Sequence, residues 1–375
     1  MHDAIIIGAG PAGCIAAIAL ARRNRNVLLV EQHRFPREKV CGECLSALGI
    51  DVLEDLGEAD RIQHHRPAIL RRTVLHSPDG SSCSLTLPRP MWGISRRRLD
   101  RELLDIATDA GVEIHQPTRC EGIEPGDRPR VRLRQLRDNR LSEVDCRMIV
   151  LADGKGTWNA KRPALTGDLG IKTWFEDVDG SPDAIELFGI PGHYGGLAPI
   201  EDGRWNAAFS VPAAAAADFR GDLGALMTHV INKNPALHLR LGHARRSADW
   251  IAAPLPRFGV QSAWPRNVIP IGNAAAALEP IGGEGMGLAM RSALLAAQWI
   301  DRVIAGENIP VEKLRRRLAA MWQRRRAVCR LMGILISRPA TAQLMVGAAD
   351  GVTGIGKMVL GAIGKADARF AAACG

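Results

Sequence analysis

Apolar and polar positions along the first 31 residues follow two different periods. Residues 4–7 (AIII) form a short continuous apolar run, which is typical of a buried strand. Residues 14–23 (CIAAIALARR) place small and apolar side chains at helical spacing, and residues 26–31 (NVLLVE) form a second apolar run that ends in an acid. The pattern predicts strand, helix and strand in succession, which is the repeating unit of a parallel α/β sheet.

The turn between the first strand and the helix is rich in glycine, because residues 8–13 read GAGPAG. Gly8 suits a tight turn, and Gly10 lets the backbone approach a pyrophosphate at the positive end of the helix. Gly13 allows close packing of the helix on the strand, and Glu31 can accept a hydrogen bond from a ribose hydroxyl. The segment predicts a site for an ADP-containing dinucleotide, which at this point is either NAD or FAD.

Two later segments repeat the combination of strand and glycine turn. Residues 147–158 (RMIVLADGKGTW) form an apolar strand that ends in Ala-Asp-Gly. Within residues 267–300, a strand leads into Gly-Asn, then a proline, a glycine-rich turn and a long amphipathic helix. A second helix N-terminus is not needed for a nicotinamide, whereas the ribityl chain and ring system of a flavin extend well beyond the ADP half. These segments favour FAD.

The quoted motifs together resemble a known family. The set GAGPAG with its following acid, GISRRRLD, LADG and GNAAAALEPIGGEGMGLA is similar to the FAD-dependent monooxygenases of the p-hydroxybenzoate hydroxylase fold. The segment FPREKVCGECLS resembles, more particularly, the branch that holds geranylgeranyl reductases and related hydroxylases and halogenases. The resemblance spans about residues 3–300, and the motifs occur in the order of the family.

The resemblance implies an α/β fold in which a Rossmann-like FAD-binding domain is interleaved with a β-sheet substrate domain and followed by C-terminal helices. We expect the FAD-binding domain to be discontinuous, over residues 1–75, 95–160 and 262–310. Residues 76–94 and 161–261 would form the substrate domain, and residues 311–375 the helical segment.

The resemblance also assigns residues to the cofactor. The implied cofactor-binding residues are Gly8, Gly10, Pro11, Ala12, Gly13, Glu31, Gln32, Arg37, Lys39, Cys41, Gly42, Arg96, Asp153, Gly154, Gly272, Asn273, Pro280, Gly283, Gly285 and Met286. Arg96 would reach the phosphate or ribose region, and Asp153 and Gly154 match a motif associated with FAD and with transient NAD(P)H binding. Asn273 stands where the family pattern has Asp, and we expect the missing negative charge to make flavin reduction easier.

Residues 39–46 (KVCGECLS) contain a Cys-x-x-Cys pair. No second such pair complements it, which argues against a zinc site, and we expect no metal. The resemblance places the segment along the FAD, where Gly42 would let the backbone approach and Arg37 and Lys39 would face phosphates or a substrate anion. Cys41 matches the position near the isoalloxazine ring in the reductases and is a candidate catalytic residue, whereas Cys44 is expected to pack.

The middle of the chain, about residues 160–262, predicts the substrate sheet through alternating strands such as AIELFGI and RWNAAFSV. Reductases of this branch carry Tyr-x-Trp-x-Phe-Pro here, and halogenases carry Trp-x-Trp-x-Ile-Pro. This chain keeps Tyr194 and Pro199 but has glycine in place of the central tryptophan, which we expect to open volume beside the flavin. Tyr194, the only tyrosine of the chain, is either a packing residue or a candidate catalytic residue of the pocket.

The favoured reaction is hydroxylation of an aromatic or electron-rich, bulky substrate by an FAD-dependent monooxygenase that uses NAD(P)H and O2. A reductase of carbon–carbon double bonds is the first alternative, and it needs a placed acid. His64, His65 and His193 are the histidine candidates, although we expect each to be a surface or structural histidine, and no carboxylate pair stands out at a useful spacing. A flavoprotein that modifies a carrier-bound or protein-bound residue is a further alternative.

The basic residues of the chain are most concentrated near the C-terminus. The formal net charge is +9, and residues 311–337 combine a run of arginines with helically spaced apolar residues (Leu314, Leu318, Met321, Trp322, Val328, Leu331 and Met332). We expect a helix that caps the substrate domain. Residues 311–340 are also a candidate surface for peripheral membrane contact or for an acidic partner.

Other classes are excluded by what the sequence lacks. It has no nucleic-acid-binding signature, no secretory leader and no apolar run of the roughly 18–20 residues that span a bilayer. The eight scattered cysteines are typical of free thiols in a reducing compartment. We expect a cytoplasmic enzyme, possible membrane contact being peripheral, that acts on a lipophilic or aromatic substrate.

Overall fold

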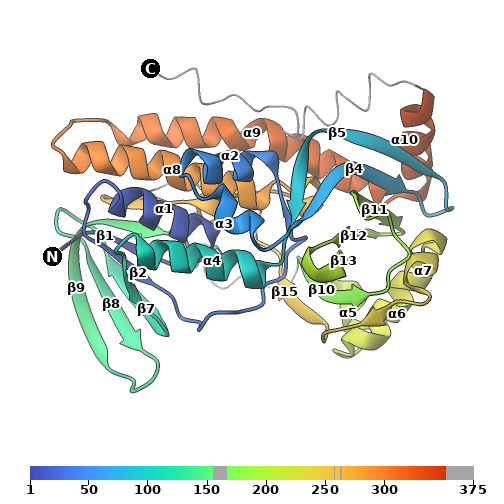
Figure 1. Cartoon of the computed structure of the whole chain (residues 1–375), viewed down its shortest axis with the longest axis horizontal. Coiled ribbons are helices and arrows are strands. Elements are labelled where there is room, and N and C mark those ends of the chain that lie inside the picture. Colours follow the sequence, from blue (N-terminus) through green and yellow to red (C-terminus); the bar gives the residue numbers. More distant parts are fainter. Residues whose placement is uncertain (155–166, 257, 262–263, 352–375) are drawn as a thin grey trace.

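The computed structural model describes residues 1–154, 167–256, 258–261 and 264–351, which contain two large sheets (Figure 1). The first sheet has seven strands in the order β6-β2-β1-β9-β8-β7, with β17 paired to β9. Its strands are β1 (His2–Ile7), β2 (Val27–Val30), β6 (Glu113–His115), β7 (Thr118–Glu124), β8 (Arg130–Gln135), β9 (Leu141–Leu151) and β17 (Val268–Pro270). The five strands β6, β2, β1, β9 and β17 are mutually parallel, as the α/β pattern predicts.

Helix α1 (Pro11–Ala21) packs beside this sheet together with two longer helices. The helix begins at a proline, the residue type that suits a first helical position, and is buried along almost its whole length. It packs against α8 (Gly285–Ile304) and α4 (Arg96–Asp109). Because β1 lies between β2 and β9, with Ile7 beside Val30 and Leu151, the glycine turn opens at the carboxyl edge of the sheet.

The second sheet has nine strands in the order β14-β10-β13-β12-β11-β4-β5-β3, with β15 paired to β10. Its strands are β3 (Cys44–Leu45), β4 (Ala68–His76), β5 (Ser82–Gly93), β10 (Asp168–Glu176), β11 (Ala184–Ile190), β12 (His193–Pro199), β13 (Trp205–Pro212), β14 (Arg245–Arg246) and β15 (Ile251–Pro254). A two-stranded sheet pairs β16 (Gly259–Val260) with β18 (Ala276–Ala277). The expected α/β architecture is confirmed, although β4 enters the second sheet at Ala68, before the expected boundary at residue 75.

Several shorter helices pack around the two sheets. They are α2 (Ala47–Asp55), α3 (Ala59–Gln63), α5 (Ala213–Ala217), α6 (Leu223–Asn232), α7 (Pro235–Leu241) and the 3-10 turns η1 (Glu201–Gly203), η2 (Gly272–Ala274) and η3 (Pro280–Gly282). Helices α6 and α7 cover the outer face of the second sheet (Figure 1), where Leu226, Met227 and Val230 are buried against it.

The C-terminal segment forms α9 (Val311–Ile336) and α10 (Pro339–Gly351), and residues 352–375 of the expected segment lie outside the described residues. Helix α9 runs beside α8 across the molecule and also packs on β12 and η3 (Figure 1). Leu314, Leu318 and Trp322 are buried as predicted. Leu331, another apolar residue of the same helix, is exposed. In the described residues no helix is long and apolar enough to cross a membrane.

Candidate functional site

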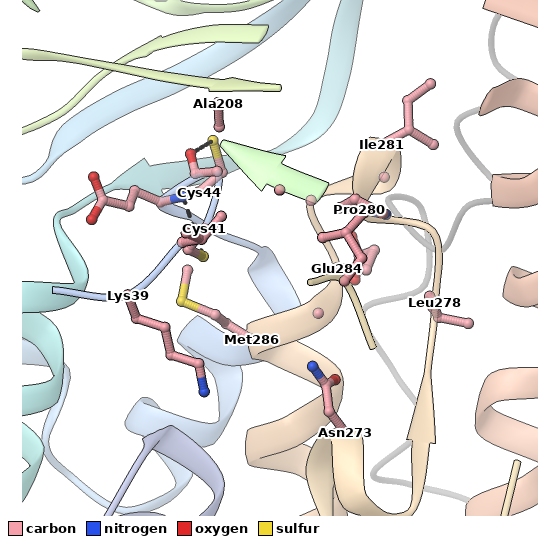
Figure 2. Close-up of a pocket in the computed structure, with 18 of the residues that line it drawn as sticks. Lys39, Cys41, Cys44, Ala208, Asn273, Leu278, Pro280, Ile281, Glu284 and Met286 are labelled. Carbon is pink, nitrogen blue, oxygen red and sulfur yellow. Dashed lines mark hydrogen bonds between the residues drawn. The ribbon is translucent and has the colours of Figure 1, made fainter. Parts of the chain in front are cut away.

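A cavity of about 260 Å³ lies where the glycine turns of the first sheet meet the second sheet. Most of the residues predicted for the cofactor or for catalysis line it: Gly10, Pro11, Ala12, Lys39, Cys41, Gly42, Arg96, Gly154, Tyr194, Gly272, Asn273, Pro280, Gly283, Gly285 and Met286. Figure 2 shows Lys39 and Cys41 on one loop of the pocket, Met286 at the start of α8 pointing toward that loop, and Asn273, the middle residue of η2, below them. Segments that are far apart in the sequence are thus brought together as expected.

Six predicted residues do not line the cavity themselves: Gly8, Gly13, Glu31, Gln32, Arg37 and Asp153. Four of these, Gly8, Gly13, Glu31 and Arg37, support the turn beside it, as described next. Gln32 is exposed, and no contact ties its side chain to the turn within the described residues.

The glycine turn is tight enough to exclude larger side chains. A Cβ atom on Gly13 would lie 1.8 Å from the carbonyl oxygen of Gly8, whose own φ is +103°. The carboxylate of Glu31 accepts a hydrogen bond from the backbone N–H of Ala9 at 3.0 Å, which fixes the turn to the end of β2. The turn therefore presents backbone N–H groups at the start of α1, where an anion is stabilised.

Three cations surround this turn. A Cβ atom on Gly10 would lie 3.8 Å from Nη2 of Arg96 and 3.9 Å from Nη2 of Arg37. Arg96 is held by two 2.7 Å hydrogen bonds to Asp100, whereas the buried Nε of Arg37 has no hydrogen-bond partner in the described part of the chain. Burial and the neighbouring charges of Arg96 and Arg37 lower the pKa of Lys39 to about 8. Excess positive charge beside the turn fits a bound pyrophosphate.

The carboxylate of Glu43, between the two cysteines, joins this loop to both sheets, a role that the sequence did not indicate. Glu43 is fully buried and accepts hydrogen bonds from Nζ of Lys172 at 2.5 Å, Nε1 of Trp174 at 2.7 Å and the backbone N–H of Arg96 at 2.8 Å. Burial raises the pKa of Glu43, and the charge of Lys172 opposes this rise. Its φ of +56° is uncommon for a residue with a side chain, so the contacts hold a strained backbone.

The two cysteines of the motif have different surroundings. Cys41 is half-buried, and its carbonyl oxygen accepts a 3.2 Å hydrogen bond from Nδ2 of Asn206 on β13. Cys44 begins β3, packs among Leu70, Met91 and other apolar residues, and also lines the cavity. Neither thiol forms a disulfide, so the motif is a loop between the cavity and the second sheet.

The far wall of the cavity carries an acid pair. The hydroxyl of Tyr194 on β12 donates a 2.6 Å hydrogen bond to Oε1 of Glu279, and both side chains are buried. Burial raises the pKa of Glu279 above its ordinary range, and burial together with the Glu279 charge raises that of Tyr194. Glu279 directly precedes Pro280 in the glycine-rich turn, which was the one available signal for it in the sequence.

Gly196, which stands in place of the central tryptophan, lines the cavity, and a Cβ atom on it would lie 3.2 Å from both the Glu186 carbonyl oxygen and Cδ2 of Leu187. The histidine candidates fit the surface or structural role expected for them: His64 is exposed, His65 bonds Glu102 at 2.9 Å, and His193 does not line the cavity. Burial lowers the pKa of His193 to about 4, so it is neutral at pH 7.

Comparisons with known proteins agree with this geometry. Residues 1–175 match the family described as FAD binding domain. Menaquinone reductase of Mycolicibacterium smegmatis is 30% identical over 329 residues, which cover 79% of this chain and 75% of the relative. Digeranylgeranylglycerophospholipid reductase of Methanosarcina acetivorans is 24% identical over 343 residues, covering 86% and 81%.

Among solved structures, that of the flavin-dependent brominase Bmp2 superposes with a TM-score of 0.80 at 20% identity, covering 97% of this chain and 93% of the brominase. At this identity the similarity shows the fold alone. The sequence relatives and the family match identify the dinucleotide that the turn and its cations fit as FAD.

The Glu43 contacts predict a large loss of stability when the carboxylate is removed. Glu43→Ala should lower the free energy of unfolding by about 3–5 kcal/mol, because the buried Lys172 loses its nearest carboxylate and keeps only Glu38, at 3.5 Å. Glu43→Gln should cost less, since the amide oxygen still accepts. Chemical unfolding followed by circular dichroism measures both. Glu121→Ala, which removes a surface ion pair with Arg134, is the control at about 0–1 kcal/mol, and an equal loss in the two alanine variants would contradict the role of Glu43.

Substitutions at two glycines distinguish a role in packing from a role in contact with the cofactor. Gly13→Ala should prevent FAD binding and destabilise the fold, because its Cβ would meet the Gly8 carbonyl. Nothing lies within 4 Å of a Cβ on Gly42, so Gly42→Ala should melt like the wild type without FAD yet bind FAD about tenfold more weakly, or about 1.4 kcal/mol. Fluorescence titration with FAD measures the affinity, and unchanged affinity in Gly42→Ala would refute contact between this loop and the cofactor.

Proposed function

The chain belongs to the family of FAD-dependent oxidoreductases that includes menaquinone reductase and the geranylgeranyl reductases, and we propose that it reduces carbon–carbon double bonds of a long, apolar, isoprenoid-type substrate. The buried Tyr194–Glu279 pair carries this proposal. Saturation of a double bond needs a proton donor placed next to the substrate, whereas hydroxylation does not. The sequence alone did not reveal such a donor.

The remainder of the cavity suits an apolar molecule. Its walls include Leu187, Leu197, Phe209, Leu278 and Ile281, together with several glycines. An apolar chain gains about 25 cal/mol for each Å² that it buries in such surroundings. A polar substrate of the same size would leave its hydrogen-bonding groups without partners along most of this surface, at a cost of about 1–3 kcal/mol for each group.

Reduced FAD, when bound, supplies the hydride for one carbon of the double bond, and we propose NAD(P)H as its transient reductant. FAD would be held by the glycine turn, by Arg37 and Arg96, and by the loop at Cys41. Glu279 provides the proton for the second carbon, so that the electron pair of the double bond and the hydride pair form two C–H bonds. Tyr194 holds the Glu279 carboxyl in place, and burial raises the pKa of that carboxyl, which favours its protonated form.

Hydroxylation remains the second candidate, because the fold and the cofactor serve it equally well. Turnover without oxygen separates the two reactions. We expect the enzyme, NAD(P)H and a polyprenyl quinone to give, under strictly anaerobic conditions, a product that is still two mass units heavier by mass spectrometry after any quinol has been reoxidised to the quinone. A product that forms only in air and is sixteen mass units heavier would establish the hydroxylase. A product that forms only from a carrier-bound substrate would instead support a carrier-dependent enzyme.

Substitution of the acid pair should affect one half-reaction only. We expect Glu279→Gln to slow substrate reduction by about 100- to 10,000-fold and Tyr194→Phe to slow it less, while NAD(P)H still reduces the FAD at the wild-type rate. Stopped-flow absorbance measures both steps. His193→Asn, which alters a buried residue outside the cavity, is the control.

The pH dependence of the same reaction follows from the raised pKa of Glu279. The carboxyl is protonated below that pKa, so the rate of substrate reduction should be constant at low pH and fall as pH rises through it. Glu279→Gln should remove this fall. A wild-type rate that increases with pH, or a profile that Glu279→Gln leaves unchanged, would exclude Glu279 as the proton donor.

A further inference from the structure

The positive charge of this protein is concentrated on one helix. Residues 311–338 hold nine lysines and arginines and a single acid, Glu312, a net charge of +8 out of +9 for the whole chain. Arginines elsewhere on the surface, such as Arg61, Arg101 and Arg130, pair with carboxylates. By contrast, five exposed arginines of this segment form no ion pair with the described residues: Arg316, Arg317, Arg326, Arg330 and Arg338.

The exposed face of α9 becomes apolar at its C-terminal end. Leu331 is 54% exposed and Ile334 is 39% exposed, and Leu344 on the adjoining α10 is 74% exposed. These three belong to a group of only seven large, exposed hydrophobic side chains in the described residues. Figure 1 shows α10 at the outer edge of the molecule, where α9 ends. A helix with a basic stripe and an apolar end is typical of a protein surface that rests on a membrane.

The opposite face of the same helical turn closes the cavity. A Cβ atom on Gly333 would lie 3.1 Å from Cγ of Glu279 and 3.6 Å from Cε1 of Tyr194. Leu331 and Ile334, on either side of Gly333 in the sequence, point away from the cavity and are exposed. One turn of α9 therefore separates the acid pair from the exposed apolar surface.

We propose that the exposed face of α9 and the start of α10, with Arg316, Arg317, Arg326, Leu331, Ile334, Arg338 and Leu344, docks on a bilayer that contains anionic lipids. The arginines contact lipid phosphates, and the three aliphatic side chains enter the boundary between headgroups and acyl chains. The arginines favour an anionic lipid surface over a neutral apolar partner, because a neutral partner would leave these arginines without counter-charges. The proposal concerns binding alone and is independent of the reaction.

Vesicle co-sedimentation of the full-length protein tests the docking directly. We expect binding to phosphatidylcholine vesicles that contain phosphatidylglycerol and about tenfold less to phosphatidylcholine alone. Binding should fall as salt rises from 0.1 to 1 M, over which the Debye length shrinks from about 10 to about 3 Å. Equal binding to both kinds of vesicle, or binding to neither, would overturn the proposal.

Matched variants locate the surface. Arg316→Glu with Arg326→Glu should abolish the preference for anionic vesicles, whereas Arg137→Glu with Arg140→Glu, on the turn between β8 and β9, should retain it. Leu331→Ser with Leu344→Ser should weaken binding, whereas Leu141→Ser with Leu239→Ser should not, although those two leucines are 61% and 65% exposed. Circular dichroism checks that each variant is folded, and equal behaviour of test and control pairs would refute the assignment.

Two further outcomes would assign the surface to another occupant and so overturn the proposal. Lipid-free self-association that Leu331→Ser with Leu344→Ser removes, seen by sedimentation velocity, would assign it to a second copy of the chain. Vesicle binding that appears only after removal of residues 352–375 would assign it to that segment.

Discussion

The buried carboxylate of Glu43 is the contact on which the arrangement of the site depends. It accepts hydrogen bonds from Lys172 and Trp174 on the second sheet and from the backbone at the start of α4, which packs on the first sheet. An unpaired buried charge costs several kcal/mol, so neither sheet can shift without the loss of a partner. These hydrogen bonds hold the strained backbone of Glu43. They also hold Cys41, two residues earlier in the loop, at the cavity.

The cavity combines two environments that would be incompatible in a single layer. Cations and a glycine turn beside the first sheet provide a site for an anionic dinucleotide. Apolar side chains, together with the pair of Tyr194 on the second sheet and Glu279 just before η3, provide a site for a hydrophobic molecule. The second environment gives Glu279 its chemistry, because burial stabilises the neutral carboxyl. Catalysis in this account therefore depends on the interleaving of two sheets and not on either sheet alone.

Local patterns in the sequence predicted the elements well. The apolar run at residues 4–7, the glycines after it and the acid at residue 31 determine their own structure within one strand–helix–strand unit. Contacts across the fold were not predictable: Lys172 is 129 residues from Glu43, and Glu279 is 85 from Tyr194. Leu331 is exposed although it is apolar, because it lies nine residues after the buried Trp322 and so on the other side of a helix with 3.6 residues per turn.

If the protein adds a hydride and a proton from Glu279 to a carbon–carbon double bond, the isotopes of solvent and oxygen should follow different routes. They can be traced by turnover of a polyprenyl quinone in D2O under ¹⁸O2, with mass spectrometry and NMR used to locate the isotopes in the product. We expect one solvent-derived deuterium on a carbon of the reduced bond and no ¹⁸O. Incorporation of ¹⁸O without deuterium on carbon would contradict this expectation and would establish a hydroxylase.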